Sequence, residues 1–224
     1  MKSSLSSQET HAYIKSLIES HIPDNIKNND KQLGKMVKDG LARLEYSFSK
    51  VKDKYFNENN APVFNHLNSD HMVVLLYYIG NSGFKSGFDK NILEKMYYLN
   101  KIMHSVDIFY SVELPDIFCV AHPLGTILGH ADYSDYFYVY QNVTVGSTKE
   151  GVYPTFGEGV ACFSNTSIIG DCKIGNNVIF TANSTIINKD IPDNSMVTGY
   201  YPDNRVIANK KPVINRLFEV DNKI

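Results

Sequence analysis

Two residues of this chain are of the types that move protons in enzymes, and they stand fifteen positions apart. His122 lies outside any regular apolar pattern, and a neutral imidazole there can take a proton from a hydroxyl near pH 7. Asp107 precedes it, and a carboxylate on one ring nitrogen would fix the tautomer and stabilise the imidazolium. The pair predicts a general base with an orienting carboxylate. The alternative is a histidine bonded to local backbone and a solvated aspartate.

Other chemistries have less support. His130 is a weaker rival for the base. The three cysteines, Cys119, Cys162 and Cys172, have no paired spacing, so they indicate buried reduced thiols rather than disulfides or metal ligands. The sequence contains no phosphate-loop, dinucleotide or nucleophile-elbow motif. We therefore expect no metal site.

Composition restricts the possible partners and the compartment. The formal net charge is −2, with 43% hydrophobic and 21% charged residues, so no strong field favours a nucleic-acid partner. Residues 1–11 are polar and carry no signal-peptide core, and the longest apolar run, near 72–79, is too short for a membrane span. We expect a cytoplasmic protein.

A six-residue repeat dominates the second half of the chain. Nine apolar or aromatic positions keep this step with one interruption: Tyr133, Val139, Val145, Phe156, Cys162, Ile168, Ile174, Phe180 and Ile186. Small or apolar residues stand four places after most of them, as at Thr166 and Ser184. A triangular solenoid with short strands needs one inward side chain per strand and a small residue at each corner. The repeat predicts a left-handed parallel β-helix, whereas a sandwich of short strands would alternate every two residues.

The first hundred residues have helical spacing instead. Apolar residues recur at three- and four-residue steps, with capping residues before them and Pro23 or Gly80 after them. We expect helices at about 6–22, 33–55, 71–79 and 90–104. The fold class is thus α+β: an N-terminal α-helical domain (1–104), a left-handed β-helix (105–208) and a C-terminal tail (209–224).

The interruption of the repeat is a candidate functional loop. Val145 and Phe156 are eleven residues apart, and the stretch between them is polar and contains glycine. Such a stretch predicts a loop pushed out of the solenoid wall, where binding residues often lie.

At these residues the chain resembles a serine acetyltransferase, a branch of the hexapeptide acyltransferases, over roughly residues 65–208. The resemblance rests on Val106-Asp107-Ile108, on His122 with Gly125 and Gly129 at family spacing, on Gln141-Asn142-Val143-Thr144-Val145-Gly146, and on Ile191-Pro192-Asp193-Asn194-Ser195.

The resemblance implies a homotrimer, or a dimer of trimers, that uses acetyl-CoA as cosubstrate. His122 would be the base and Asp107 its orienting partner, and the cofactor arm would lie in a groove between subunits. By position its contacts would be Gly146, Ser147, Ser164 and Ala182, with a backbone N–H near Gly146 or Ser147 for the oxyanion. Candidates for the CoA phosphates would be Lys189, Arg205, Lys210 and Lys211, and the alternative is that these are plain surface cations.

Two departures from the family bear on the acceptor. The family has an aspartate where this chain has Ala121, and a second histidine where it has Tyr153 before Pro154; both family residues help to hold the amino acid. Losing both polar partners favours a sugar hydroxyl, as in similar enzymes that decorate surface polysaccharides. Tyr153 and His130 would then bind the saccharide.

Three other functions stay open on the sequence. An amino-sugar N-acetyltransferase would depend less on His122, because a neutral amine is already nucleophilic. A true serine acetyltransferase would release CoA only with serine. A non-catalytic trimeric scaffold would not bind acetyl-CoA, and it would need neither Asp107 nor His122.

Overall fold

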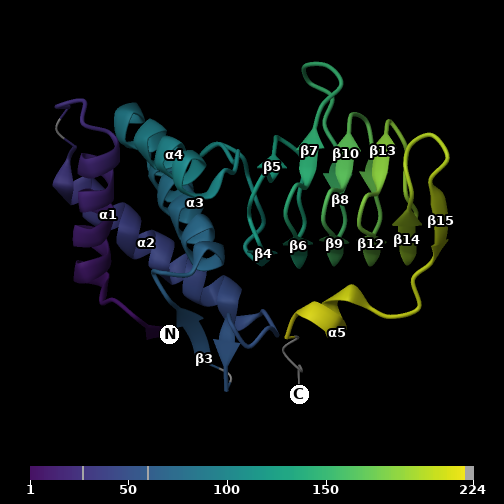
Figure 1. Cartoon of the computed structure of the whole chain (residues 1–224), viewed down its shortest axis with the longest axis horizontal. Helices are drawn as coiled ribbons and strands as arrows, with labels where there is room; N and C mark the ends of the chain where they lie inside the picture. The colour runs from purple at the N-terminus through teal and green to yellow at the C-terminus, as the bar shows by residue number, and fades with distance from the viewer. Residues whose placement is uncertain (27, 60, 220–224) are drawn as a thin grey trace.

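The computed structural model describes residues 1–26, 28–59 and 61–219. Figure 1 shows a group of helices on one side and a row of short stacked strands on the other. This arrangement confirms the predicted order of an α-helical region followed by a left-handed parallel β-helix. The long helices are α1 (Ser7–His21), α2 (Asp30–Ser49), α3 (Ser69–Lys85) and α4 (Lys90–His104).

The helices begin where capping side chains precede them. Ser6 Oγ accepts a hydrogen bond from the Glu9 backbone N–H, and the Glu9 carboxylate accepts one from the Ser6 backbone N–H, which forms a capping box. Asn29, Asn68 and Asp89 cap the other three. The second helix ends at Ser49 rather than near Tyr55, because Val51 bridges to Phe218 and residues 53–56 turn before the chain enters a small sheet. That sheet, which the pattern did not predict, consists of β1 (Lys2–Ser3), β2 (Asn57–Glu58) and β3 (Ala61–Phe64).

The β-helix has three faces of stacked strands. The first face contains β4 (Phe118–Val120), β6 (Phe137–Val139), β9 (Val160–Cys162), β12 (Val178–Phe180) and β14 (Ser195–Thr198), with β15 (Arg205–Ala208) added antiparallel at its end. The second face contains β5 (Ile127–Leu128), β7 (Thr144–Gly146), β10 (Ser167–Ile169) and β13 (Thr185–Ile187). The third contains β8 (Thr155–Phe156) and β11 (Lys173–Ile174), extended by parallel bridges to Asp132 and Ile191.

The six-residue repeat points into this solenoid. Cys162, Ile168, Phe180 and Ile186 are fully buried, and the small partners at the corners are buried as well. All three cysteines are free and buried. Packed coils of this kind leave no room for larger side chains inside, which explains the strict spacing.

Asparagines hold the corner that leads from the first face to the second, called the first corner below. Asn142, Asn165 and Asn183 all have positive φ, between 55° and 64°, and asparagine tolerates that conformation better than most residues. Their side chains form a ladder, because the Asn142 amide donates to Asn165 and the Asn165 amide donates to Asn183, each at 3.0 Å. The ladder fixes the stacking of successive coils along this edge.

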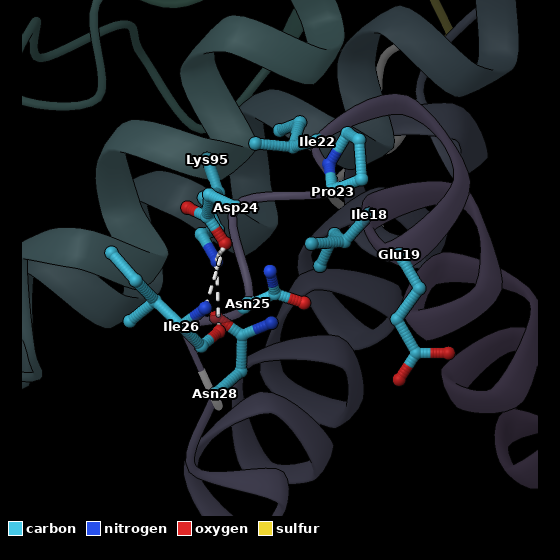
Figure 2. Close-up of a pocket in the computed structure, with 9 residues that line it drawn as sticks. All are labelled: Ile18, Glu19, Ile22, Pro23, Asp24, Asn25, Ile26, Asn28 and Lys95. Carbon is cyan, nitrogen blue, oxygen red and sulfur yellow. Dashed lines mark hydrogen bonds and ion pairs between the residues drawn. The ribbon is translucent and has the colours of Figure 1, made fainter.

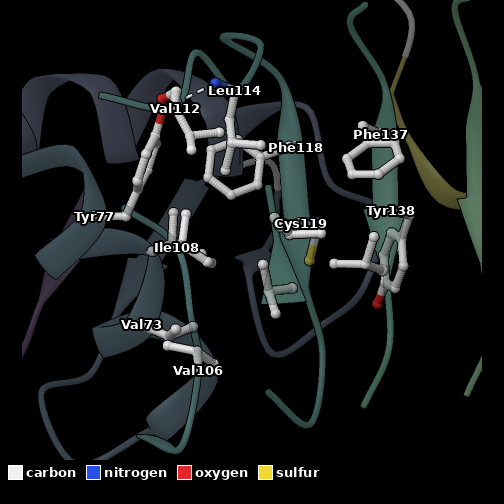
Figure 3. Packing of buried hydrophobic residues seen from close by; sticks show 14 of the residues in the cluster. Val73, Tyr77, Val106, Ile108, Val112, Leu114, Phe118, Cys119, Phe137 and Tyr138 are labelled. Atoms are coloured by element: carbon white, nitrogen blue, oxygen red, sulfur yellow. Dashed lines mark hydrogen bonds between the residues drawn. The ribbon is translucent and has the colours of Figure 1, made fainter. Parts of the chain in front are cut away.

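The helices and the β-helix share one buried seam. Figure 3 shows Tyr77 of α3 beside Val112, Leu114 and Phe118 at the entrance to the solenoid. The Tyr77 hydroxyl donates to the Val112 carbonyl at 2.8 Å and accepts from the Leu114 backbone at 2.9 Å. Ser47 Oγ donates to the Phe118 carbonyl at 2.9 Å. The first coil is therefore anchored on the helices.

The chain after the solenoid returns to this seam. Residues 209–219, the described part of the expected tail at 209–224, include the short helix α5 (Val213–Leu217) and pack over the first face. Phe218 is fully buried, contacts the rings of Tyr136 and Tyr138, and bridges to Val51 after α2. We call residues 209–219 the return segment.

A hollow of about 330 Å³ lies between α1, the following loop and α4 (Figure 2). The buried Lys95 side chain closes one side of it, and its ammonium donates to Asp24 at 2.8 Å and to the Ile26 carbonyl at 3.1 Å. Burying a lysine is tolerable here because both contacts satisfy its charge and donors. We read this hollow as structural, since none of the candidate site residues lines it.

The buried His104 makes the helical region sensitive to acid. The Asn100 amide nitrogen donates to the Val73 carbonyl, so its oxygen accepts from His104 Nδ1 at 2.8 Å. Burial lowers the pKa of His104 to about 4, and burial also lowers the pKa of His71. Between pH 6.5 and 4 the unfolded chain binds more protons than the folded one, so stability falls as the pH drops through this window.

We therefore expect the protein to lose about 2 kcal/mol of stability through His104 alone between pH 7 and pH 5. Thermal unfolding at the two pH values would measure this. In His104→Asn, whose amide can still donate to Asn100, the loss should be smaller by that amount. The matched control is His21→Asn at an exposed site, which should keep the wild-type pH response. An unchanged response in His104→Asn would contradict the assignment.

Candidate active site

His122 lies on a two-residue bulge at the first corner. Phe118 pairs with Phe137, nineteen residues on, whereas Ile127 pairs with Thr144, seventeen residues on. The corner between these strands therefore has two more residues in the first coil than in the second. The bulge brings His122 out of the wall with φ of 53°, a left-handed conformation that histidine adopts more readily than most residues and that Asn142 shares at this corner. Such backbone is often found at functional sites.

The His122 side chain is exposed and open to a substrate. Its ring lies 6.2 Å from the Tyr140 ring, centre to centre, and no hydrogen bond or ion pair joins it to any residue that the structure describes. Both ring nitrogens are thus available to a hydroxyl and to an orienting group. This is the geometry expected of a base before its substrate arrives.

Asp107 lies near this corner but faces the helices. Its backbone bridges to Ile127 of the next coil, and its carboxylate accepts hydrogen bonds from Tyr97 and Lys101 of α4, each at 2.7 Å. Partial burial acts to raise the pKa of Asp107, but the two hydrogen bonds and the Lys101 charge outweigh it and hold the pKa below its usual value. The expected hydrogen bond between Asp107 and His122 is not present among the described residues.

The extruded loop lies at another corner, between the second and third faces, called the second corner below. Its Tyr153 is 39% exposed, and the Tyr153 ring meets the His130 ring edge-on at 5.9 Å between centres. A hollow of about 570 Å³ opens here, lined by Glu113, His130, Ala131, Asp132, Gly151 and Tyr153. His130 and Tyr153, the two residues expected to bind the acetyl acceptor, therefore lie together in one hollow. No lysine or arginine of the described ranges lines it.

His122 and this hollow stand at opposite edges of the second face. His122 precedes β5, while His130 follows β5 and Tyr153 follows β7. Each strand of that face turns its two ends to different corners, so one chain presents the base at one corner and the acceptor hollow at another.

The expected cofactor residues divide between the same two corners. Ser164 and Ala182 lie at the first corner, in the coils after His122, whereas Gly146 and Ser147 begin the loop at the second corner. Lys189 follows β13 and donates to the Asn204 side chain. Arg205 is exposed on β15 at the far end of the solenoid, and Lys210 and Lys211 are exposed on the return segment. Within a single chain these residues do not form one cluster.

The first corner holds residues that the sequence pattern did not single out. Tyr140 and Phe163 follow inward-facing positions in successive coils, and their rings stack at 5.0 Å with an angle of 13°. Their spacing in the repeat could have revealed the pair, since both stand one place after an inward residue. Arg216 on α5 faces the same edge, but no repeat marks the path of the return segment.

The described residues contain neither a metal-binding cluster nor a membrane-spanning helix. No group of three histidines, cysteines or acidic residues in that part of the chain is placed to hold a metal ion. No helix in the described ranges is long and apolar enough to cross a membrane.

Sequence comparison finds relatives for a little less than half of the chain, while no family model matches it. A serine acetyltransferase of Synechococcus elongatus is 28% identical over 106 residues, covering 46% of this chain and 43% of the relative. One of Staphylococcus epidermidis is 27% identical over 105 residues, covering 45% and 49%. The match thus spans less than half the length of these relatives.

Solved structures match over a longer range. The serine acetyltransferase of Neisseria gonorrhoeae has a TM-score of 0.69 at 20% identity, covering 95% of this chain and 84% of that one. The enzyme of Brucella abortus has a TM-score of 0.66 at 16% identity, covering 88% and 83%. Each of these relatives is a serine acetyltransferase, so the expected saccharide acceptor finds no support in the comparisons.

The anchoring of Asp107 on α4 leads to a testable expectation. Asp107→Asn and Lys101→Met should lower the thermal unfolding midpoint by similar amounts, because both break the same pair. We expect turnover in both variants to stay far above that of His122→Ala. Unfolding curves and initial rates would measure the two effects. A large fall in turnover in Asp107→Asn but not in Lys101→Met would show instead that Asp107 orients the base.

The repeat, the corner bulge that carries His122, the sequence match and the shared architecture lead to one conclusion: the chain is similar to the serine acetyltransferases and has the helical region and left-handed β-helix of the hexapeptide-repeat acyltransferases.

Proposed function

We propose that the protein is an acetyl-CoA-dependent O-acetyltransferase with His122 as its general base. The observation that carries the proposal is the exposed His122 on its two-residue bulge, in a fold similar to that of serine acetyltransferases. One solved relative, from Brucella abortus, is described in complex with coenzyme A. A cytoplasmic location is part of this proposal, and it is supported by the three buried free thiols, which fit a reducing compartment.

The reaction follows from the chemistry of the imidazole. His122 takes the proton of the acceptor hydroxyl while the hydroxyl oxygen attacks the thioester carbonyl carbon of acetyl-CoA. The tetrahedral intermediate collapses with cleavage of the carbon–sulfur bond. The leaving thiolate takes the proton back from the imidazolium, which gives the acetyl ester and free CoA.

Serine is the leading acceptor, because the curated relatives are serine acetyltransferases and one solved relative, from Neisseria gonorrhoeae, is described in complex with serine. A sugar hydroxyl of a polysaccharide precursor is the second candidate. The hollow at the second corner favours it: Glu113 and Asp132 line that hollow, and no cation there could bind the carboxylate of an amino acid.

Thiol release from acetyl-CoA tests the proposal and separates the acceptors. The assay compares serine with neutral sugars, amino sugars and nucleotide sugars. We expect release with a hydroxyl acceptor, reduced by about 10²–10⁴-fold in His122→Ala. His21→Ala serves as the control at an exposed site on a helix end. Release only with amino sugars, largely unaffected in His122→Ala, would indicate N-acetylation. No release and no acetyl-CoA binding would favour a scaffold.

The separation of the two corners supports an active site shared between subunits. We propose that a homotrimer places the second corner of one protomer against His122 of the next. A head-to-tail ring repeats such a contact three times.

Subunit mixing would check the shared site. His122→Ala and the double variant His130→Ala/Tyr153→Ala should each be nearly inactive as pure trimers. Random mixed trimers should recover about a quarter of wild-type activity, because a quarter of their sites join an intact His122 to an intact loop. Recovery should need unfolding and joint refolding, with separately refolded variants as the control. Activity that stays absent in mixed trimers would contradict the shared site.

A further inference from the structure

A further hollow lies on the first face, two to four coils beyond His122. It measures about 280 Å³ and is lined by Phe163, Ile179, Thr181, Ala182, Met196 and Arg216. All but Arg216 belong to the solenoid, whereas Arg216 comes from α5 of the return segment. The hollow is therefore apolar with one cation at its rim.

Arg216 has no anionic partner in the part of the chain that the structure describes. Its side chain is exposed, and no hydrogen bond, ion pair or ring contact there involves it. Arg216 also lines an adjoining hollow with Lys52 and Asp53. There Asp53 accepts from the Tyr55 backbone and Lys52 donates to the Asn215 carbonyl, and no ion pair joins Asp53 to Arg216. A guanidinium beside apolar walls that forms no ion pair with a carboxylate is suited to a ligand that has both an apolar part and an anionic group.

The position of the hollow gives the length of that ligand. His122 lies at the first corner of the first coil, and Ala182 lies at the same corner three coils later. Parallel coils are about 4.8 Å apart, so the hollow begins roughly 10 Å from the base at Phe163 and reaches roughly 14 Å at Ala182. A molecule that reacts at His122 and ends at Arg216 must span this distance along the corner.

Acetyl-CoA has the required chemistry in the required order. Thirteen bonds separate its sulfur from the first phosphorus, which is about 15 Å when extended. A carbon with two methyl groups stands just before the phosphates. With the thioester at His122, this apolar branch reaches the walls formed by Phe163 and Met196, and the phosphates reach Arg216.

We propose that Arg216 binds the diphosphate of acetyl-CoA, and that the return segment is thereby part of the cofactor site. The inference rests on the proposed function, because it needs acetyl-CoA to lie at His122. It assigns a role to a helix outside the repeat, and it places the phosphates at the first corner rather than beside Arg205 at the end of the solenoid.

Kinetics with two donors test the proposal on the full-length protein. Acetyl-CoA carries the phosphates, and acetyl-pantetheine lacks them. Arg216→Gln should raise the KM for acetyl-CoA about tenfold and leave the KM for acetyl-pantetheine unchanged, since a charge-assisted contact is lost only with the first donor. Arg216→Lys should recover part of the difference. The matched control is Lys173→Gln, which removes a cation on the third face, away from the hollow. This variant should behave as wild type with both donors.

The possible results distinguish an error in the role of Arg216 from an error in the proposed acetyltransferase function. If wild type uses acetyl-CoA and Arg216→Gln keeps the wild-type preference for it over acetyl-pantetheine, the role of Arg216 is wrong and the proposed function stands. If sedimentation shows that Arg216→Gln dissociates the oligomer without a donor-specific change in KM, the hollow is an interface between copies, which also overturns the inference. Failure of wild type to bind acetyl-CoA by calorimetry would overturn the proposed function itself.

Discussion

The stacking of coils at one fixed backbone register is the constraint on which the rest of this structure depends. Each strand pairs in parallel with the strand one coil away, so every corner residue lies above its counterpart in the next coil. Because the strands on both sides of the first corner keep this register, the two extra residues between β4 and β5 project from the wall at that corner. His122 stands on that projection, and the stacked corners beyond it form a straight edge along which a long substrate can lie.

The sequence predicted the solenoid because its inward positions are set by a period. Phe180 and Ile186 must fill a narrow interior at every sixth residue, and nothing distant in the chain alters that requirement. The helices were predicted for a similar reason, from local spacing and caps such as Ser6 with Glu9. The small sheet of β1, β2 and β3 was missed, because its strands are too short to carry a pattern of their own.

The candidate site was predicted only in part. Residue type and spacing identified His122, and the extruded loop drew attention to Tyr153, which lies beside His130 in one hollow. Spacing also suggested that Asp107 meets His122, but side chains from α4 compete for the carboxylate, and sequence distance contains no information about Lys101. Arg216 was missed because the path of the return segment depends on tertiary contacts with Tyr136 and Tyr138.

The bridge between Val51 and Phe218 joins the chain just after α2 to the return segment, with the whole β-helix between them in the sequence. During synthesis the helices and each coil can form in turn as they leave the ribosome, since their contacts are with preceding residues. The seam between the two regions is different, because its last component, Phe218, follows the whole solenoid. Completion of the monomer therefore waits for almost the entire chain, and a ribosome that stalls within the solenoid leaves the outer surface of Tyr138 uncovered and prone to aggregation.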